Sequence, residues 1–363
     1  MLGPWFLSPT LAVGANSALG YVGRRWRRER THQRPQFARA YGDRMQVDSL
    51  PLVGPPTPLL PMSRLGSALG IGTDRLWVKR DDLTLVGGGG NKARKLALLC
   101  ADALDVGATV LVTGGAVQSN HVRVTGAAAA MAGLRAVGVV GGRRGAPEGN
   151  VVLDALFGIE LIDAADRYGA VDLAAAIEAE CERLRSAGER PYHIPLGGSS
   201  PLGASGYVAA AEEIRAALGD CTVYVADGTG GTHAGLVAGF GDHRRVRGVD
   251  VGAVPDVAGV VAALAGDVAS VVDRPVPIGV PWVDGGQVGA GYGRSTRAAE
   301  EAMTLAARTE GLVLDPVYTS KAFAAMVHDV RDQALPDGPV VFLHTGGLPG
   351  LFVERHMRTM AGG

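Results

Sequence analysis

The segment GGGGNKARK, residues 87–95, says more about the fold of this chain than any other stretch. Its four glycines let the backbone pass close to a ligand, and Lys92 then stands where a loop gives way to the apolar periodicity of a helix. A lysine amine at the edge of a pocket can form a Schiff base. A nucleotide P-loop is excluded, because Asn91 precedes the lysine and Ala93 follows it where that motif requires glycine and a hydroxyl residue.

A second glycine-rich segment, VADGTGGTHAGL at residues 225–236, leads from a strand into a helix. It lacks the third glycine of the dinucleotide fingerprint, which argues against a Rossmann cofactor site. Its backbone N–H groups at a positive helix end suit a phosphate, although an ordinary turn between strand and helix is the alternative interpretation. A reactive lysine and a phosphate cup together imply pyridoxal phosphate.

The chain from Leu76 onward repeats short β-branched runs, glycine turns and amphipathic helices, which predicts an α/β fold with parallel strands. Glycine turns at 114–116, 227–231 and 345–347 follow strands, so all three are expected to face one pocket. Strands are predicted at 76–79, 109–113, 136–140, 222–226 and 340–343, and helices at 92–104, 120–131, 171–185, 207–218, 255–264 and 296–308.

Composition narrows the class of partner. With 363 residues the chain exceeds one typical core, which favours two lobes around a cleft. A net charge of -1 and a pI of about 6.7 give no field that would attract nucleic acid or an anionic membrane, so a small molecule is the expected partner. The three cysteines lie too far apart for a metal or disulfide framework, which suggests a reducing cytoplasm.

The first 45 residues read differently from the rest. Residues 5–23 are fairly apolar, but the arginines follow that stretch, whereas a secretory signal places its charges first. Proline, asparagine and glycines also weaken a membrane span. We expect residues 1–45 to be a disordered extension, or alternatively a start codon placed upstream of a true beginning at Met45.

Five motifs together resemble the D-cysteine desulfhydrase / 1-aminocyclopropane-1-carboxylate deaminase family over about residues 51–351. They are GGNKxRK (89–95), QSNHxR (118–123), GGTHAG (230–235), DPVY (315–318) and HTGG (344–347). The resemblance implies a two-lobed, three-layer αβα fold of the tryptophan-synthase-β-like type (fold type II), pyridoxal phosphate and, as is usual in the family, a homodimer. It places residues 46–90 and 195–363 in a larger cofactor-binding domain and 91–194 in a smaller one.

The resemblance also assigns roles. Lys92 resembles the Schiff-base lysine, while Lys95, one turn on, is expected to be solvated or ion-paired. Asn120 matches a residue at the ring hydroxyl of the cofactor, and Thr345 one beside the pyridine nitrogen. Ser119 and the helix start after it can hold a substrate carboxylate, or Ser119 is a plain helix N-cap. The predicted catalytic residues are Lys92, Ser119, Tyr292 and Tyr318; the cofactor-binding residues Lys92, Asn120, Gly228, Thr229, Gly230, Gly231, Thr232 and Thr345; the substrate-binding residues Ser119, Asn120, His121 and Thr319, with His121 alternatively a packing residue; no metal is expected.

Two positions choose within the family. The deaminases carry glutamate directly after the tyrosine of DPVY, where this chain has Thr319. They carry leucine in place of the threonine of HTGG, which is Thr345 in this chain. Threonine cannot act as an acid or base at neutral pH, which disfavours the deaminase reaction. Threonine at both positions resembles the desulfhydrases, which implies β-elimination from an amino acid with sulfur on Cβ. The expected substrate is D-cysteine, although no motif reports the handedness at Cα and an L-amino acid stays an alternative. Lys92 would take the Cα proton, and Tyr318 or Tyr292 would protonate the leaving thiolate. A deaminase, a lyase for cysteate or another β-substituted amino acid, and a catalytically silent pyridoxal phosphate-binding protein remain alternatives.

Overall fold

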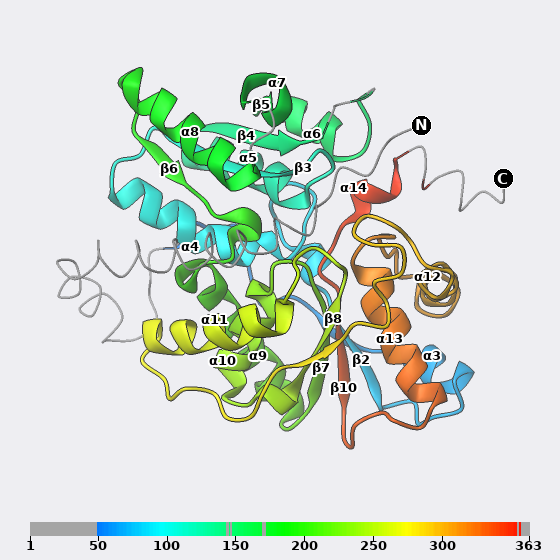
Figure 1. Ribbon diagram of the computed structural model, residues 1–363. Coiled ribbons are helices and arrows are strands. Elements are labelled where there is room, and N and C mark those ends of the chain that lie inside the picture. The colour runs from blue at the N-terminus through cyan, green and yellow to red at the C-terminus, as the bar shows by residue number, and fades with distance from the viewer. Residues whose placement is uncertain (1–48, 143–144, 146, 169–171, 354–355, 357–363) are drawn as a thin grey trace.

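The computed structural model describes residues 49–142, 145, 147–168, 172–353 and 356. It contains two β-sheets, and Figure 1 shows the smaller one in the upper part of the molecule and the larger one in the lower part. The predicted extension at 1–45 lies outside the described residues. Across the part of the chain that the structure describes, no helix combines the length and apolarity needed to cross a bilayer.

The larger sheet has six strands, all parallel to their neighbours except β1, which is antiparallel to β2. Every residue of β7 and β10 is buried, as expected for parallel strands covered on both faces. In spatial order the strands are β1 (Leu59–Pro61), β2 (Leu76–Lys79), β10 (Val340–Leu343), β7 (Thr222–Asp227), β8 (Val246–Asp250) and β9 (Trp282–Asp284).

The smaller sheet has four parallel strands. Their spatial order is β5 (Glu160–Asp163), β4 (Arg135–Gly141), β3 (Val110–Ala116) and β6 (Pro191–His193).

Helices cover both faces of each sheet, which gives three layers. On the large sheet, Tyr224 and Phe342 point into a core with α12 and α13, whereas the alternate residues Val223 and Val341 point into a core with α9, α10 and α11. The helices are α3 (Ser63–Ala68), α4 (Lys92–Asp105), α5 (Asn120–Ala132), α6 (Asn150–Leu156), α7 (Ala164–Tyr168), α8 (Leu173–Ser186), α9 (Pro201–Leu218), α10 (Gly231–Phe240), α11 (Val257–Val271), α12 (Arg297–Glu310), α13 (Thr319–Arg331) and α14 (Leu348–Leu351).

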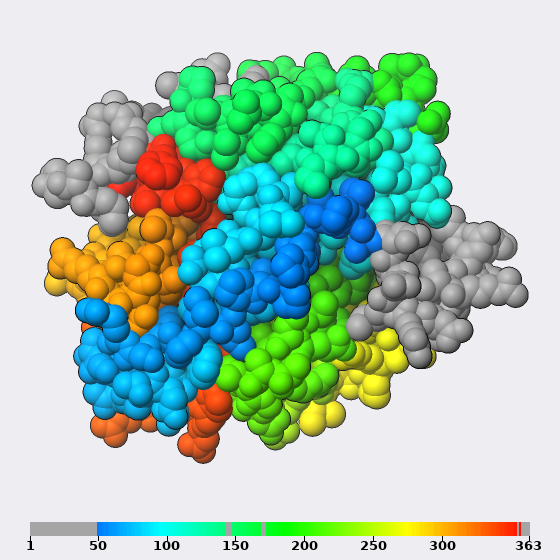
Figure 2. Space-filling view, turned by 180° about the vertical axis from the view of Figure 1, so that it is seen from behind, coloured from blue at the N-terminus to red at the C-terminus, as the bar shows by residue number. Residues whose placement is uncertain are grey.

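The first described residues join the two sheets. Leu52 is fully buried among α4 and α5 residues beside the small sheet, and seven residues later the chain enters the edge strand β1 of the large sheet. Figure 2 shows this blue segment crossing the back of the molecule between the cyan and green parts.

The predicted strands are all present, but three predictions were wrong at their boundaries. Residues 114–116 were predicted as a turn and instead continue β3. Helix α9 begins at Pro201 rather than at residue 207, because Ser200 accepts a hydrogen bond from the Gly203 N–H and caps the helix. Helix α11 extends to Val271 because its own residues Val268 and Ala269 are buried in the core beside α9 and α10. The predicted helix at 171–185 is α8, and Val171 lies outside the described residues.

Candidate active site

The loop before Lys92 is held in a conformation that requires glycine. Gly87, Gly88, Gly89 and Gly90 have φ values of 58°, 80°, 77° and 121°. A Cβ added to Gly89 would lie 1.9 Å from the Asp82 carbonyl oxygen, so no other residue fits there. The loop therefore fixes where α4, and Lys92 as its first residue, begins.

The Lys92 amine points toward the turn that follows β6. Its Nζ lies 3.5 Å from the Gly197 carbonyl oxygen. Burial of the amine end lowers the lysine pKa from its usual 10.5 to about 8. Part of the population is therefore neutral near pH 8, as a nucleophilic or proton-accepting lysine requires.

Lys95 corrects an expectation from the sequence. It is buried, with 1% of the residue exposed, and it forms no ion pair with the residues that the structure describes. Its Nζ donates to the Gly197 carbonyl oxygen and to Ser199 Oγ, both at 3.2 Å. Burial, followed by the charge on Lys92, lowers its pKa well below 10.5. The spacing of three residues from Lys92 puts both side chains on one helix face, and this was the signal that the sequence analysis missed.

Lys95 adds a cation to the predicted phosphate cup. A Cβ on Gly231, the first residue of α10, would lie 2.8 Å from the Lys95 Nζ. Gly230, which precedes α10, is in the left-handed region and no side chain caps the helix, so its first N–H groups are available. A buried ammonium beside an uncapped helix start suits a small anion such as a phosphate.

Hydroxyl and amide side chains complete the cup. Thr229 Oγ1 and Ser199 Oγ share a hydrogen bond of 2.7 Å. Thr232 Oγ1 accepts from the side-chain amide of Asn91 at 3.0 Å, and the Asn91 N–H donates to the Thr345 carbonyl oxygen at 3.0 Å. The lysine loop, the cup and the end of β10 are thus joined through Asn91.

The start of α5 lies beside the two lysines. Ser119 is the N-cap, and its Oγ accepts from the N–H groups of His121 and Val122 at 3.2 and 3.3 Å. The buried Asn120 Oδ1 has no hydrogen-bond partner among the described residues, as expected of an atom that serves a ligand. Burial and the charges of Lys92 and Lys95 lower the His121 pKa well below 6.5, so its imidazole is neutral.

Tyr292 and Tyr318 contact each other. The hydroxyls of Tyr292 and Tyr318 hydrogen-bond to each other, with the rings edge to face and their centroids 6.0 Å apart. Tyr318 reaches the cup, because a Cβ on Gly228 would lie 3.5 Å from its Cε1. Burial raises the pKa of both phenols, so both stay protonated at neutral pH and can donate protons.

Thr319 is turned inward. It is fully buried, and its Oγ1 donates to Asp315 Oδ1 at 2.7 Å. The other Asp315 oxygen accepts from the backbone N–H of Tyr318 at 3.0 Å. The structure thus places Thr319 in the turn that orients Tyr318. Thr345, which is 8% exposed, follows β10, and its carbonyl oxygen accepts a hydrogen bond from the Asn91 N–H.

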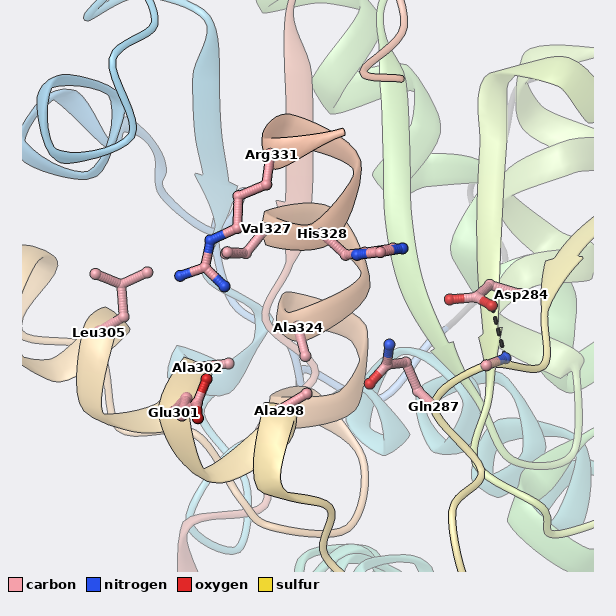
Figure 3. A pocket seen from close by; sticks show the side chains of 11 residues that line it. Asp284, Gln287, Ala298, Glu301, Ala302, Leu305, Ala324, Val327, His328 and Arg331 are labelled. Atoms are coloured by element: carbon pink, nitrogen blue, oxygen red, sulfur yellow. Dashed lines mark hydrogen bonds between the residues drawn. The ribbon is translucent and has the colours of Figure 1, made fainter. Parts of the chain in front are cut away.

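A separate pocket of about 330 Å³ contains none of the predicted site residues. Figure 3 shows it between α12 and α13, with Glu301 and Arg331 projecting from its walls and Gln287 from the segment after β9. The pocket shares two elements with the tyrosines, because α13 directly follows Tyr318 and the segment after β9 leads to Tyr292.

Residues 50–346 match the family described as "Pyridoxal-phosphate dependent enzyme". The chain belongs to this family. Pyridoxal phosphate is therefore its cofactor, and the lysine, the anion cup and the unpartnered Asn120 oxygen fit that group.

Within this family, the chain is similar to desulfhydrases and to a deaminase homologue. The D-cysteine desulfhydrases of Salmonella schwarzengrund (strain CVM19633) and Salmonella typhi are each 41% identical over 325 residues, which cover 84% of this chain and 95% of the relative. A crystal structure of "the ACC deaminase homologue" has a TM-score of 0.79 at 34% identity and covers 90% of this chain and 99% of that one. These findings confirm the resemblance stated from the motifs.

More distant structures agree on the fold alone. Threonine deaminase isoform 2 from Solanum lycopersicum has a TM-score of 0.58 at 16% identity, over 85% of this chain and 83% of its own. The predicted two-lobed αβα fold of the pyridoxal phosphate enzymes is confirmed.

Proposed function

We propose that this family member is a carbon–sulfur lyase that converts D-cysteine and water to pyruvate, hydrogen sulfide and ammonia. The observation that carries the lyase chemistry is the convergence of Lys92 and Lys95 on one oxygen, that of Gly197. One amine has a pKa of about 8 and the other lies at the start of α10. The substrate follows the desulfhydrase relatives at 41% identity.

The cofactor is held at two ends in this proposal. Lys92 binds its aldehyde carbon, and Lys95 with the residues from Gly228 to Thr232 holds its phosphate. Asn120, whose Oδ1 has no partner among the described residues, would hydrogen-bond to the ring hydroxyl, and Thr345 would hold the ring nitrogen. When bound, pyridoxal phosphate supplies the electron sink that cleavage at Cα and Cβ of an amino acid requires.

Lys92 is then the base that removes the Cα proton. A neutral amine is required, and the lowered pKa provides it in part of the population near pH 8. The backbone N–H groups at the start of α5, with Ser119 and Asn120, orient the substrate carboxylate. His121 stays uncharged and packs beside the lysines.

The leaving sulfur receives its proton from the tyrosine pair. Tyr318 lies at the cup and Tyr292 donates to or accepts from its hydroxyl, so a proton lost by one can be replaced through the other. Thr319 contributes by orienting Tyr318 through Asp315, and we propose this in place of direct substrate contact.

A second candidate is 1-aminocyclopropane-1-carboxylate deamination, which the solved deaminase homologue at 34% identity favours. Opening the ring calls for a proton donor or acceptor at the position of Thr319 in the deaminases, and threonine bound to Asp315 supplies none at neutral pH. D-Cysteine is therefore the first substrate to test.

The test compares wild type with Lys92→Ala. Purified protein is supplied with pyridoxal phosphate, its visible spectrum is recorded, and pyruvate and sulfide are measured with D-cysteine, L-cysteine, 1-aminocyclopropane-1-carboxylate and, as a substrate without a leaving group, D-alanine. We expect equal pyruvate and sulfide from D-cysteine alone, and neither lysine-linked absorbance nor turnover in the variant. Yellow protein inert to D-cysteine would refute the substrate, and colourless protein would refute the role of Lys92.

We further propose that the protein acts in the cytoplasm as a homodimer. All three cysteines are buried free thiols, which suits a reducing compartment. Light scattering of the purified chain measures the oligomeric state directly: twice the chain mass of 37.3 kDa is expected, and a monomer at micromolar concentration would refute the dimer.

A further inference from the structure

Arg123 is a fully buried arginine that the proposed chemistry does not use. It lies on α5, one helical turn after Ser119, and it reaches across to the glycine loop. Its Nη1 donates to the Gly87 carbonyl oxygen at 2.5 Å and its Nη2 to the Gly89 carbonyl oxygen at 3.1 Å. A planar guanidinium that holds two carbonyl oxygens of one loop fixes both the position and the tilt of that loop.

The loop needs such a clamp. Four consecutive glycines in the left-handed region have more conformational freedom than any other residues, so ordering them is entropically unfavourable. Downstream, Thr84 Oγ1 and the Thr345 carbonyl oxygen hold the N–H groups of Gly90 and Asn91. Upstream, Arg123 holds the carbonyls. Lys92 follows directly, so any drift of the loop would move its amine.

A buried carboxyl faces this arginine. Asp154 of α6 is fully buried, and neither of its oxygens has a hydrogen-bond partner among the described residues. Burial raises its pKa to about 7, against the opposing effect of the Arg123 charge, and burial lowers the Arg123 pKa to about 10. The arginine thus makes its hydrogen bonds to the loop and takes only charge compensation from Asp154.

Helix α6 is itself attached beside Ser119. The Asn150 N–H donates to Gln118 Oε1 at 2.8 Å, and the Asn150 side chain donates to the Gln118 carbonyl oxygen at 3.0 Å. Asp154 is one turn further along the same helix. The start of α5, α6 and the glycine loop therefore meet at Arg123.

We propose that Arg123 is a positioning residue that locks the glycine loop, and with it the Lys92 amine, to the helix that begins after Ser119, with Asp154 as its counter-charge. The inference rests on the proposed function only for the role of Lys92. In this proposal the Arg123 side chain sets the distance between the Lys92 amine and the expected carboxylate site at Ser119.

The test uses Arg123→Lys, which keeps the charge but cannot hold both carbonyls, with Arg167→Lys as the matched control. Arg167 lies in the same lobe, is partly exposed and pairs with Glu180. In the cofactor-free protein, hydrogen exchange of the Gly90 and Asn91 amides should accelerate by about tenfold or more in Arg123→Lys alone. Exchange in the rest of α4 and α5 should stay unchanged.

A second measurement follows the lysine itself. The amount of pyridoxal phosphate bound at saturation is compared with the fraction that borohydride fixes to Lys92, identified by peptide mass. We expect binding within about twofold of wild type and a fraction fixed that falls by about tenfold. The double variant Arg123→Met/Asp154→Asn removes both charges together, so it should regain the wild-type urea midpoint while the fraction fixed stays low.

Unchanged exchange at Gly90 and Asn91 in Arg123→Lys would overturn the proposal, as would a uniform acceleration over α4 and α5. Recovery of normal fixation in the double variant would overturn it too, because Arg123 would then matter only through the charge of Asp154. None of these readouts involves an amino-acid substrate. If the wild-type protein were inactive toward D-cysteine while the variants showed the expected exchange and fixation, the proposed function would be refuted and the role of Arg123 would be retained.

Discussion

Lys95 is the residue whose environment departs most from its sequence context. Its buried amine donates to a carbonyl and to a hydroxyl, and burial together with the Lys92 charge lowers its pKa. A phosphate bound beside it would favour the charged form of the amine. We expect Lys95→Met, which keeps the length of the side chain, to weaken pyridoxal phosphate binding by about 10- to 100-fold, because a hydrogen bond to a charged group is worth about 1.5–3 kcal/mol. A fluorescence titration measures this, and binding of pyridoxal without phosphate should hardly change. Equal loss for both compounds would contradict a phosphate contact.

The lowered Lys92 pKa predicts a pH dependence for cofactor capture. Below pH 8 the amine is mostly protonated and cannot attack the aldehyde, so the capture rate of the cofactor-free protein should rise with pH and level off above about 8. An unperturbed lysine would keep gaining rate up to about pH 10.4. Stopped-flow absorbance between pH 6 and 10 measures the break, and a continued rise beyond pH 9 would contradict burial of the amine.

At the scale of elements, α9 shows how glycine serves helix packing. A Cβ on Gly206 would lie 2.2 Å from the Arg94 carbonyl oxygen, so α9 and α4 touch backbone to backbone there. We expect Gly206→Ala to destabilise the protein by about 1–3 kcal/mol or more. Gly266→Ala in α11, where a Cβ meets nothing within 4 Å, should instead stabilise it by about 0.4–1 kcal/mol. Urea unfolding of the two variants measures both, and equal signs would contradict the packing account.

The same glycines explain which elements could be predicted. Continuous apolar runs such as Val340–Leu343 indicate their burial directly. The motifs singled out Lys92, the glycine turn before α10 and Tyr318, and the structure brings these segments near one another. The predicted helix began only at residue 207, after Gly203 and Gly206, because a sequence does not distinguish a glycine that bends the chain from one that lets another element pack closely. Lys95, Gly197 and Ser199 were missed for a related reason: their roles depend on α4 meeting the turn after β6, which is a contact between distant segments.

At the scale of the whole molecule, the proposed site collects residues that follow strands of both sheets, since Ser119 comes after β3 and Gly228 and Thr345 come after β7 and β10. Filling the site should therefore stabilise the entire chain. A ligand at 100 times its Kd adds about 2.7 kcal/mol to the free energy of unfolding. We expect pyridoxal phosphate to raise the Tm in a concentration-dependent manner, and inorganic phosphate at millimolar concentration to raise it less, because phosphate fills only the cup. Differential scanning calorimetry in phosphate-free buffer measures both. No shift with inorganic phosphate would contradict an independent anion site.

The shared contact at Gly197 has a consequence for vitamer selection. One backbone oxygen lies near both amines, so the separation between the covalent and the ionic attachment points is set by a single peptide unit and not by two flexible side chains. We therefore propose that the separation of the two amines selects for the length of the cofactor. A B6 analogue whose phosphate arm is one methylene longer would then fit either attachment point but not both, and the protein would exclude it without any contact to the ring.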